Sequence, residues 1–385
     1  MKTAVIIDGV RTPVGTAKAD TGYYRNVRAD DLAAHVIKGL IDKTGIDPAI
    51  VEDVYFGCVQ QQSEQGFNVA RTACLIAGLP VETSAATVNR LCASGLLAIN
   101  SAARAIMTGC EDVHIVGGVE HMHHYPMDKD VNPSPRMGYK NFRAAMAMGI
   151  TAEYVAMKYF VTREEQDEFA YHSHMKAHQA TEKGLFKDEI VPTWGLDEKG
   201  HRQLFTKDQT IRPDTNLEAL AKLPPAFNPK GGLVTAGNSS PLSVGAAALL
   251  MMSEDRAKQL GLKPKVRIRS MAVAGCEPCE MGIGPTRATP KALERAGLSL
   301  DDIDAIELNE AFAAQSIAVI RLAGFNPDIL NTRGGAIALG HPLGCSGARI
   351  MVTLIHRMEQ DKKKFGLATL CVGGGMGEAT IVEAC

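Results

Sequence analysis

The stretch Val88-Asn89-Arg90-Leu91-Cys92-Ala93-Ser94-Gly95 decides how this chain folds. A short β-favouring run, residues 86–88, leads into it. An apolar pattern with helical spacing leads away from it to Gly109, which stands where a helix would end. Because strands that pass directly into helices build layered α/β proteins, this junction indicates that fold class.

Cys92 lies at the predicted junction, where unpaired backbone N–H groups and the positive end of the helix dipole meet. Such a position lowers a cysteine pKa from about 8.5 toward neutrality and makes the thiolate a competent nucleophile. The small residues 93–95 let a substrate approach the backbone closely. A buried, inert cysteine of an α/β core is the alternative interpretation.

The same pattern returns near the other end of the chain. Leu91-Cys92-Ala93-Ser94-Gly95 resembles Leu343-Gly344-Cys345-Ser346-Gly347, and each opens an apolar helical pattern. About one helix further on, Val116-Gly117-Gly118 resembles Val372-Gly373-Gly374. We therefore expect each half of the chain to be a copy of one unit.

Strand-like and helix-like segments alternate in both halves. The expected strands are residues 4–7, 54–56, 113–116, 266–273, 303–308 and 367–372. The expected helices are residues 30–43, 68–77, 93–108, 288–296, 310–323 and 346–358. This alternation predicts an α/β protein whose strands are mostly buried.

The segment between the halves has another character. We assign residues 1–118, completed by 242–262, to the N-terminal half, 119–241 to an insertion, and 263–385 to the C-terminal half. The insertion is rich in Met, His, Lys and Pro, and we expect it to cover a site. Inside it, Thr162 and Glu165 form a capping box, and the helix that follows is polar enough to lie on the surface.

Composition limits the protein class. The 385 residues are 45% hydrophobic and 22% charged, which suits a globular protein with a sizeable core. A formal net charge of -2 gives no basic field, so nucleic acid is excluded as the main partner. The nine cysteines lack paired spacings, the N-terminus predicts a strand, and no stretch approaches the apolar length of a membrane span. We expect a cytoplasmic protein with reduced thiols.

Three clusters that follow predicted strands in the second half carry reactive groups. They are residues 307–313, 334–344 and 371–377. The Cys92 and His341 pair suggests acyl transfer, for which a thiol hydrolase is one interpretation. A second thiol, Cys371, fits carbon–carbon cleavage or formation better, because a carbanion must then be protonated. Glycines after Cys371 offer backbone N–H groups to an oxyanion.

These motifs, in this order, resemble the thiolase family over essentially the whole chain. The matching stretches are Asn89-Arg90-Leu91-Cys92, Gly117-Gly118-Val119-Glu120, Val234-Thr235-Ala236-Gly237-Asn238-Ser239-Ser240, Asn309-Glu310-Ala311-Phe312, Gly340-His341-Pro342-Leu343-Gly344-Cys345-Ser346-Gly347 and Cys371-Val372-Gly373-Gly374-Gly375. The resemblance implies a duplicated five-layer αβαβα core with an inserted loop domain.

The resemblance also implies a role for each motif residue. Cys92 is expected to attack the 3-keto carbonyl of a 3-ketoacyl-CoA and to keep the acyl chain as a thioester. His341 is expected to accept the Cys92 proton, and Asn309 to fix a water at the thioester oxygen. Cys371 is expected to protonate the departing enolate and then deprotonate CoA. The N–H groups of Cys92 and Gly373 are expected to form a second oxyanion hole.

Coenzyme A is the implied substrate, with no permanently bound cofactor and no metal. The resemblance places six residues around it: Ser240 near the pantetheine, Arg212 beside the adenine, and Met148, Leu223, Ala236 and Phe312 along the tunnel. Short-chain biosynthetic thiolases carry His-Met-Gly where this chain has Ala147-Met148-Gly149, so one polar contact near the pantetheine is missing.

Residues 24–32, 57–61 and 64–71 resemble one branch, the thiolase subunit of bacterial fatty-acid β-oxidation complexes. The implied reaction is thiolytic cleavage of a 3-ketoacyl-CoA, the last step of β-oxidation. The implied assembly is a homodimer bound to hydratase/dehydrogenase alpha subunits in an α2β2 complex, with membrane association at most through that complex. A biosynthetic acetoacetyl-CoA thiolase and a silent thiolase-like protein that binds lipid or CoA remain the alternatives.

Two other clusters carry weaker signals. Cys276 and Cys279 form a CxxC without a second pair, so we interpret the spacing as structural. The cluster His121-Met122-His123-His124 has a metal-like composition, but neighbouring histidines on a strand alternate faces and converge poorly on one ion. We expect polar roles at the rim of the pocket for these histidines.

Overall fold

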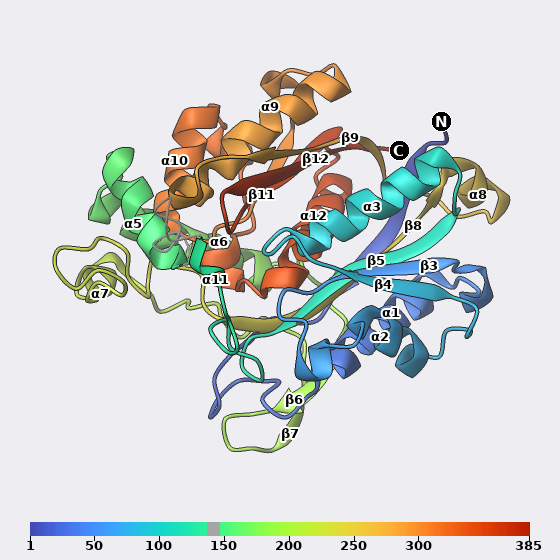
Figure 1. Cartoon of the computed structure of the whole chain (residues 1–385), viewed down its shortest axis with the longest axis horizontal. Coiled ribbons are helices and arrows are strands. Elements are labelled where there is room, and N and C mark those ends of the chain that lie inside the picture. Colours follow the sequence, from blue (N-terminus) through green and yellow to red (C-terminus); the bar gives the residue numbers. More distant parts are fainter. Residues whose placement is uncertain (137–146) are drawn as a thin grey trace.

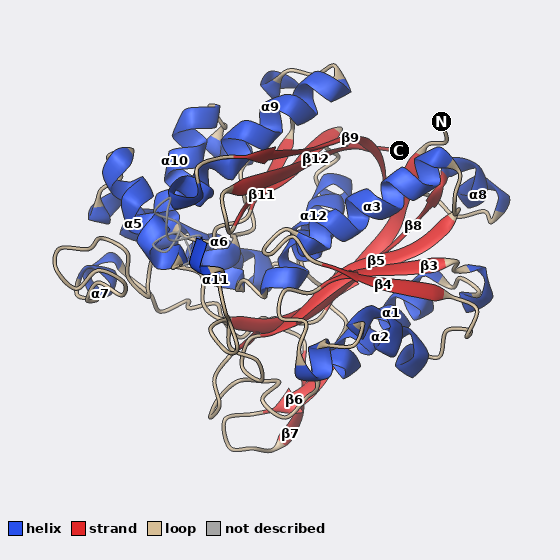
Figure 2. Ribbon diagram, in the orientation of Figure 1, coloured by secondary structure: helices blue, strands red, loops and turns tan. Residues whose placement is uncertain are grey.

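The computed structural model describes residues 1–136 and 147–385, and it has the layer order α/β/α/β/α (Figure 1, Figure 2). Helices α3 and α12 lie between two parts of the sheet, α1 and α2 lie outside one part, and α9 and α10 lie outside the other. The predicted thiolase-like α/β fold is confirmed. The chain ends lie near each other at one side of the molecule (Figure 1).

The main sheet follows the order β10-β11-β12-β9-β1-β8-β5-β3-β4. Its strands are β1 (Ala4–Arg11), β3 (Asp53–Gly57), β4 (Ser84–Val88), β5 (Val113–His121), β8 (Ser243–Ser253), β9 (Val266–Gly275), β10 (Ala305–Leu308), β11 (Phe365–Val372) and β12 (Met376–Ala384), with β2 (Gly15–Thr16) beside β8. The two halves of the sheet meet where β1 pairs with β9, at Val5–Arg267 and Ile6–Val266. The sheet bends at this short contact, which leaves room for the central helices.

The central helices α3 (Ser94–Thr108) and α12 (Leu343–Gln360) touch backbone to backbone near their N-termini. A Cβ at Gly347 would lie 2.2 Å from the backbone nitrogen of Leu96, and one at Gly95 would lie 2.9 Å from the Gly344 oxygen. The repeated Ser-Gly motif therefore has a packing reason, because only glycine permits this approach.

Helix α3 also corrects one expectation from the sequence. The segment Leu91–Thr108 is long and apolar enough to cross a membrane by length and composition. Our statement that no stretch approaches that length was wrong. In the structure α3 is a core helix between the two parts of the sheet, and burial there explains its apolar composition.

The outer helices each cover one face of the sheet. They are α1 (Ala29–Thr44) and α2 (Val69–Ala77) on the N-terminal half, and α9 (Gly284–Ala296) and α10 (Ala313–Ala323) on the C-terminal half, with α8 (Glu254–Gln259) at the rim. Helix α1 buries Leu32, Val36 and Leu40 at helical spacing and ends at Gly45, whose φ of 66° is the left-handed cap conformation.

Residues between β5 and β8 form the region that we predicted as an insertion. It contains α5 (Met148–Lys158), α6 (Arg163–Glu182), β6 (Thr193–Leu196), β7 (Arg202–Phe205) and α7 (Leu217–Ala221), and residues 137–146 within it lie outside the described part. The short α11 (Ala336–Leu339) packs beside it. The limits of the insertion, residues 119–241, remain a prediction.

Helix α6 begins as expected, but some of its polar side chains are buried. The Thr162 hydroxyl accepts from the Glu165 N–H at 3.3 Å, and the Glu165 carboxylate accepts from the Thr162 N–H at 2.9 Å, so the capping box is present. The surface position that we expected holds for one face, on which Glu164, Glu168 and His172 are exposed. On the other face Gln166, Asp167 and His174 are buried. Buried polar groups need hydrogen-bond partners, and other segments supply them to this helix.

Candidate active site

The turn before α3 presents Cys92, and its own polar side chains shape it. The Asn89 side-chain oxygen accepts from the Leu91 N–H at 2.8 Å. The Ser94 hydroxyl accepts from the Arg90 N–H at 2.9 Å and donates to the Leu91 carbonyl at 2.6 Å. Leu91 has a φ of 46°, an uncommon value that these bonds hold in place. The motif therefore encodes the turn that carries Cys92.

A partly buried ion pair ties this turn to the other half of the molecule. The Arg90 guanidinium donates to the Glu378 carboxylate of β12 at 2.9 Å, and Asn100 of α3 donates to the other Glu378 oxygen at 2.7 Å. Glu378 is fully buried. Removing one partner of such a pair costs several kcal/mol, so the contact fixes the Cys92 turn against β12.

The backbone N–H groups of Gly373 and of Cys92 itself face the Cys92 sulfur and act to lower its pKa. The family resemblance implies these two donors for one oxyanion hole. Burial nevertheless raises the pKa of the Cys92 thiol to about 11, against the opposing pull of the two N–H groups. The pKa near neutrality that we expected from the helix N-terminus was wrong, and the resting group is a thiol.

Cys371, near the end of β11, is the second thiol of the site. Burial raises its pKa well above the ordinary value, and the nearby Cys92 raises it further. Met148, Phe312 and Met281 pack in the same apolar cluster as Cys371. A thiol held neutral in apolar surroundings is available to donate a proton.

His341 is held by a hydrogen bond that sequence reasoning missed. Its Nδ1 lies 2.6 Å from the Ser346 hydroxyl, which also lies 3.0 Å from the Pro342 carbonyl. Because that carbonyl can only accept, the hydroxyl donates to it and accepts from Nδ1–H of the imidazole. Nε2 is then the bare nitrogen, as a base requires. Ser346 was in a quoted motif, but nothing in the sequence tied it to His341.

The environment keeps this imidazole neutral. Burial and, to a smaller extent, the charge of Arg349 lower the pKa of His341 to about 3. The Asn309 amide nitrogen lies 3.4 Å from Nε2. The Asn309 side-chain oxygen is buried and has no partner among the described residues, so it is free to hold a water proton.

Glu120, at the end of β5, joins the two halves behind the site. Its buried carboxylate accepts from the N–H groups of Val59 at 2.9 Å, Gln60 at 3.1 Å and Gly344 at 2.8 Å. Gly344 lies in the first turn of α12, three residues after His341. Glu120 was quoted as part of a motif without a role, and the structure identifies it as the anchor for the start of α12.

The reactive groups lie at the ends of β10 and β11 and at the starts of α3 and α12. The Gly373 N–H faces the Cys92 sulfur, Cys371 is near Cys92, and Asn309 is beside His341. Strands β10 and β11 are parallel neighbours, so their ends bring Asn309 and Cys371 to the same edge. The close contact of the α3 and α12 starts brings the two pairs toward each other.

A cavity of about 420 Å³ is lined by three of the predicted CoA residues, Arg212, Leu223 and Ala236. Its other lining residues include Lys18, Thr21 and His174. Lys18 and His174 were missed, because they come from distant segments and belong to no recognisable motif. The volume falls in the range of small-molecule sites.

The other predicted CoA residues lie outside this cavity. Met148 and Phe312 pack with Cys371, and the Ser240 hydroxyl donates to the Ala311 carbonyl at 2.9 Å. Phe227, which sequence reasoning missed, packs edge-on against Phe312, with 5.9 Å between the ring centres. The predicted CoA residues therefore divide into two groups: Arg212, Leu223 and Ala236 line the cavity, and Met148 and Phe312 pack beside Cys371.

In the histidine cluster, the ring nitrogens of His121 and His124 are occupied. Glu64, His121 and His124 offer ligand atoms within 4.8 Å of one another, closer than the sequence suggested. However, the His121 and His124 rings are stacked with centres 3.7 Å apart, so their lone pairs do not converge. His121 bonds the Tyr24 carbonyl and the His124 N–H, while His124 bonds Glu64 and the Arg25 carbonyl. These contacts are structural.

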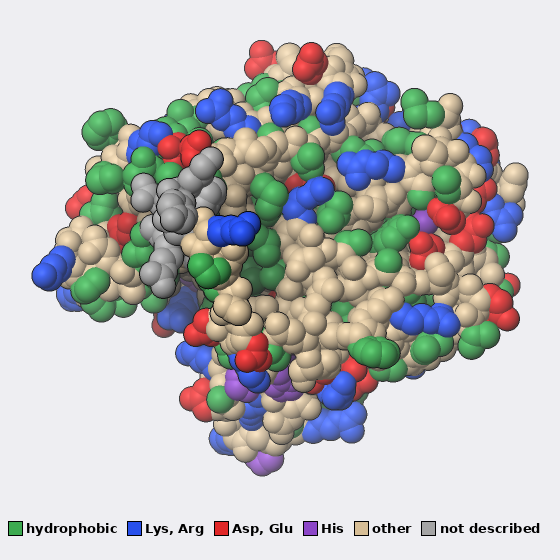
Figure 3. All heavy atoms as spheres, in the orientation of Figure 1, with side chains coloured by type: hydrophobic (Ala, Val, Ile, Leu, Met, Phe, Trp, Pro, Cys, Tyr) green, Lys and Arg blue, Asp and Glu red, His purple; other side chains and the backbone are tan. Residues whose placement is uncertain are grey.

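The surface charges and the cysteines show no further specialised feature among the described residues. Figure 3 shows basic and acidic side chains interspersed over the visible face, without one dominant sign. All nine cysteines are free, including Cys276 and Cys279.

Comparisons with known proteins cover the whole chain. The family model "Thiolase, N-terminal domain" matches residues 4–255, and "Thiolase, C-terminal domain" matches residues 262–384. The chain is 54% identical to the 3-ketoacyl-CoA thiolase of Photobacterium profundum and 53% identical to that of Idiomarina loihiensis, over 100% of each chain.

Two solved structures are similar over their full length. Human mitochondrial 3-ketoacyl-CoA thiolase has a TM-score of 0.92 at 36% identity. The Bacillus anthracis acetyl-CoA acetyltransferase has a TM-score of 0.90 at 41% identity. Each match covers 100% of this chain and 99% of the other.

Proposed function

This chain belongs to the thiolase family, and from that premise we propose that it cleaves 3-ketoacyl-CoA with CoA, as an acetyl-CoA C-acyltransferase of fatty-acid β-oxidation. The products are acetyl-CoA and an acyl-CoA two carbons shorter. The observation that carries the proposal is the Cys92 thiol at the start of α3, with the Gly373 N–H directed at it and a second buried thiol, Cys371, nearby.

In the first half-reaction, His341 Nε2 takes the proton from Cys92, and the sulfur attacks the 3-keto carbon. The bond between C2 and C3 of the substrate then breaks, its electrons form the enolate of acetyl-CoA, and Cys371 protonates that carbon. The acyl group stays on Cys92 as a thioester. The lowered pKa of His341 and the raised pKa of Cys371 support these roles, because the base starts neutral and the acid starts protonated.

In the second half-reaction, the Cys371 thiolate takes the proton of CoA, whose sulfur attacks the acyl carbon on Cys92. The N–H groups of Cys92 and Gly373 stabilise the oxyanion of this adduct. When the adduct collapses, Cys92 leaves and regains its proton from His341. Each donor of such a hole is worth about 3–4 kcal/mol of barrier.

The experiment that tests the reaction is an assay of 3-ketoacyl-CoA cleavage by the wild-type protein and by Cys92→Ala. The proposal expects cleavage by the wild type and loss in the variant. Full activity in Cys92→Ala would refute it, and binding of CoA without cleavage by the wild type would instead indicate the silent binding protein.

A biosynthetic acetoacetyl-CoA thiolase is the second candidate, and the similarity to an acetyl-CoA acetyltransferase structure favours it. Ala147, where short-chain biosynthetic thiolases carry histidine, favours the degradative reaction. Rates on 3-ketoacyl-CoA substrates of increasing chain length decide between them: the degradative proposal expects medium or long chains to react faster than acetoacetyl-CoA.

For the assembly we propose a homodimer formed through the free edge of β4. This strand ends the sheet. Next to it, Phe67 is 103% exposed, Val81 71% and Leu75 47%, so an apolar edge is open to a second copy. Light scattering of the wild type and of Val81→Glu tests this, with a dimer expected for the first and a monomer for the second.

We also propose that the dimer binds a hydratase/dehydrogenase alpha subunit, and that the enzyme works in the cytoplasm. The branch-like stretches 24–32, 57–61 and 64–71 support the first proposal. The nine free thiols support the second, because the cytoplasm keeps thiols reduced. Size-exclusion chromatography with the purified alpha subunit tests the complex, which the proposal expects to elute ahead of the dimer.

A further inference from the structure

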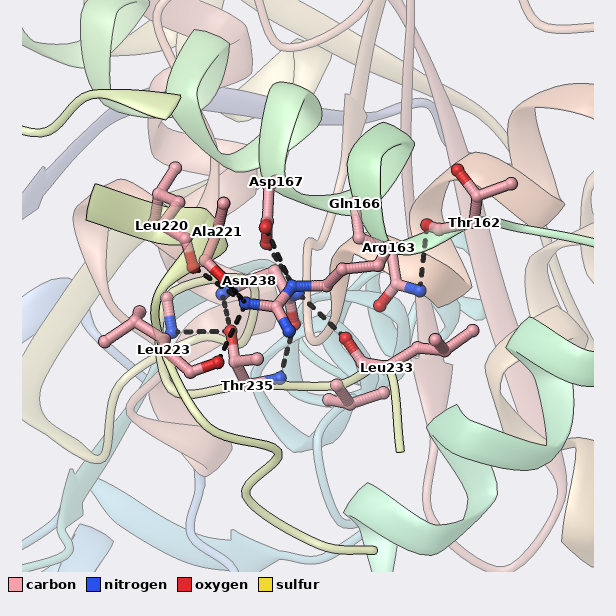
Figure 4. A network of polar contacts seen from close by, with 12 residues as sticks. Thr162, Arg163, Gln166, Asp167, Leu220, Ala221, Leu223, Leu233, Thr235 and Asn238 are labelled. Atoms are coloured by element: carbon pink, nitrogen blue, oxygen red, sulfur yellow. Dashed lines mark hydrogen bonds and ion pairs between the residues drawn. The ribbon is translucent and has the colours of Figure 1, made fainter. Parts of the chain in front are cut away.

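Arg163, the first residue of α6, binds the end of α7, which is distant in the sequence. One guanidinium nitrogen, Nη2, lies 2.7 Å from the Leu220 carbonyl and 2.9 Å from the Leu223 carbonyl. Leu220 lies in the last turn of α7, where its carbonyl also accepts from the Leu223 N–H at 3.0 Å, and Leu223 follows the helix. Figure 4 shows the guanidinium in the middle of this network. Arg163 therefore closes the exposed end of α7.

The same guanidinium is held in place by its own helix. Its Nε donates to the Asp167 carboxylate at 2.7 Å, one turn further along α6. The other Asp167 oxygen accepts from the Asn238 amide at 2.9 Å, and the Asn238 oxygen accepts from the Thr235 N–H at 2.8 Å (Figure 4). Asp167 and Asn238 are buried, so these charged bonds are shielded from water.

The end of α7 and the loop 235–238, which these bonds hold, pack against each other at Gly237. A Cβ there would lie 2.5 Å from Leu223 Cδ1 and 2.6 Å from Leu220 Cδ2. Leu220, Leu223 and Gly237 all line the 420 Å³ cavity that also contains Arg212. The spacing between these two walls therefore depends on contacts behind them, on α6.

We propose that Arg163, Asp167 and Asn238, the α6 clamp, are positioning residues that set the width of the cavity for the nucleotide end of coenzyme A. The inference rests on the proposed function, since the ligand is CoA. The clamp acts through Leu220, Leu223 and residues 235–237, and it contacts none of Cys92, His341 and Cys371. It governs affinity for the CoA nucleotide and leaves the chemical steps unchanged.

Arginine is required because the clamp uses a planar fork. Its nitrogens reach two carbonyls and one carboxylate from a single side chain. A lysine keeps the charge but presents a single nitrogen and cannot hold both segments. Loss of one hydrogen bond to a charged group corresponds to a change in affinity of about tenfold or more.

The experiment compares Arg163→Lys with the wild type on two substrates. One is acetoacetyl-CoA with CoA as acceptor, and the other is the acetoacetyl thioester of N-acetylcysteamine with N-acetylcysteamine as acceptor, which lacks the nucleotide. We expect KM for CoA to rise about tenfold with kcat within about twofold. With the truncated substrate, kcat/KM is expected to stay within about twofold of the wild type.

Arg321→Lys is the matched control. Arg321 also bonds a carboxylate of the first turn of α6, that of Glu165, but it contacts neither α7 nor the 235–240 loop. It is expected to behave as the wild type with both substrates. An equal loss with both substrates in Arg163→Lys, or no change in KM for CoA, would overturn the inference. A wild type inactive on both substrates and on medium-chain and long-chain 3-ketoacyl-CoA would instead refute the proposed function.

Gly237→Ala gives an independent test that leaves Arg163 in place. Its new methyl group would push Leu220 and Leu223 away from the 235–237 wall. The same selective rise in KM for CoA is expected. If Arg163→Lys does not fold, this variant decides: unchanged KM for CoA in Gly237→Ala contradicts the role of the wall spacing.

Discussion

The starts of α3 and α12 are two copies of one motif, and the molecule uses them differently. Cys92 precedes α3 and remains partly accessible, with the Gly373 N–H on its sulfur. Cys345 lies inside the first turn of α12, is 1% exposed and packs in the core. Burial raises the pKa of both thiols, to about 11 and about 12. A helix N-terminus alone therefore does not produce a reactive cysteine.

The serines of the two copies, in contrast, have equivalent roles, because each forms hydrogen bonds beside a reactive group. Ser94 bonds the backbone of Arg90 and Leu91 and shapes the turn that carries Cys92. Ser346 bonds the ring of His341 and the carbonyl of Pro342. Each copy thus holds one reactive group of the site: a nucleophile in the first half and a base in the second.

The largest expected effect is the difference in kcat between substitutions of Cys92 and of Cys345. Cys92→Ala is expected to lower kcat for 3-ketoacyl-CoA cleavage by at least about 10⁴-fold, because it removes the nucleophile. Cys345→Ala is expected to keep kcat within about threefold, since that sulfur only fills the core. Comparable losses in the two variants would show that the copies do not differ in the way described.

The pH dependence of alkylation sharpens the same contrast. Because the Cys92 pKa is raised to about 11, the reactive thiolate is a minor species at neutral pH and grows as the pH rises. The rate of iodoacetamide modification at Cys92 is expected to rise about tenfold per pH unit between pH 7 and 10. A plateau near pH 7 would mean that the helix dipole outweighs burial. Cys345 is expected to stay unmodified in the native protein.

The two serines should give smaller and distinct effects. Ser346→Ala frees the other tautomer of His341, so kcat is expected to fall about tenfold while Cys92 alkylation stays unchanged. Ser94→Ala loosens the Cys92 turn and is expected to slow both alkylation and turnover. Identical profiles for the two variants, measured by steady-state kinetics and by alkylation rates, would argue against separate roles.

The packing of the two helices gives the smallest change and tests the duplication itself. Gly347→Ala places a methyl group against the Leu96 backbone and is expected to lower the free energy of unfolding by about 1–3 kcal/mol. Gly297→Ala, at a φ of 66° in the outer cap of α9, meets no neighbouring atom and controls for backbone strain alone. Denaturant unfolding measures both variants.

Much of the fold could be predicted because it depends on local patterns. The helix expected over residues 93–108 is α3, and the one expected over 346–358 lies within α12. Strand β8 was not predicted as a strand, because its uninterrupted apolar sequence has no alternation to distinguish a buried strand from a helix. A continuous apolar segment can be assigned as a strand or a helix only when the segments that pack against it are known.

The site was less predictable, since its electrostatics come from distant segments. The expected low pKa of Cys92 used the local dipole and omitted the burial that the C-terminal half imposes. The polar face of α6 indicated a surface helix, yet Asp167 is buried by Asn238, 71 residues away. Motifs pointed to the candidate reactive groups, and only the folded chain showed which contacts hold them.

The most direct test of the account is to locate the acyl group during turnover. Incubation with 3-ketoacyl-CoA, rapid acid quenching and peptide mass spectrometry should find the shortened acyl chain on the peptide that contains Cys92. No acyl group is expected on the peptide with Cys345. An acyl chain on any other residue, or substrate cleavage without a covalent intermediate, would contradict the account.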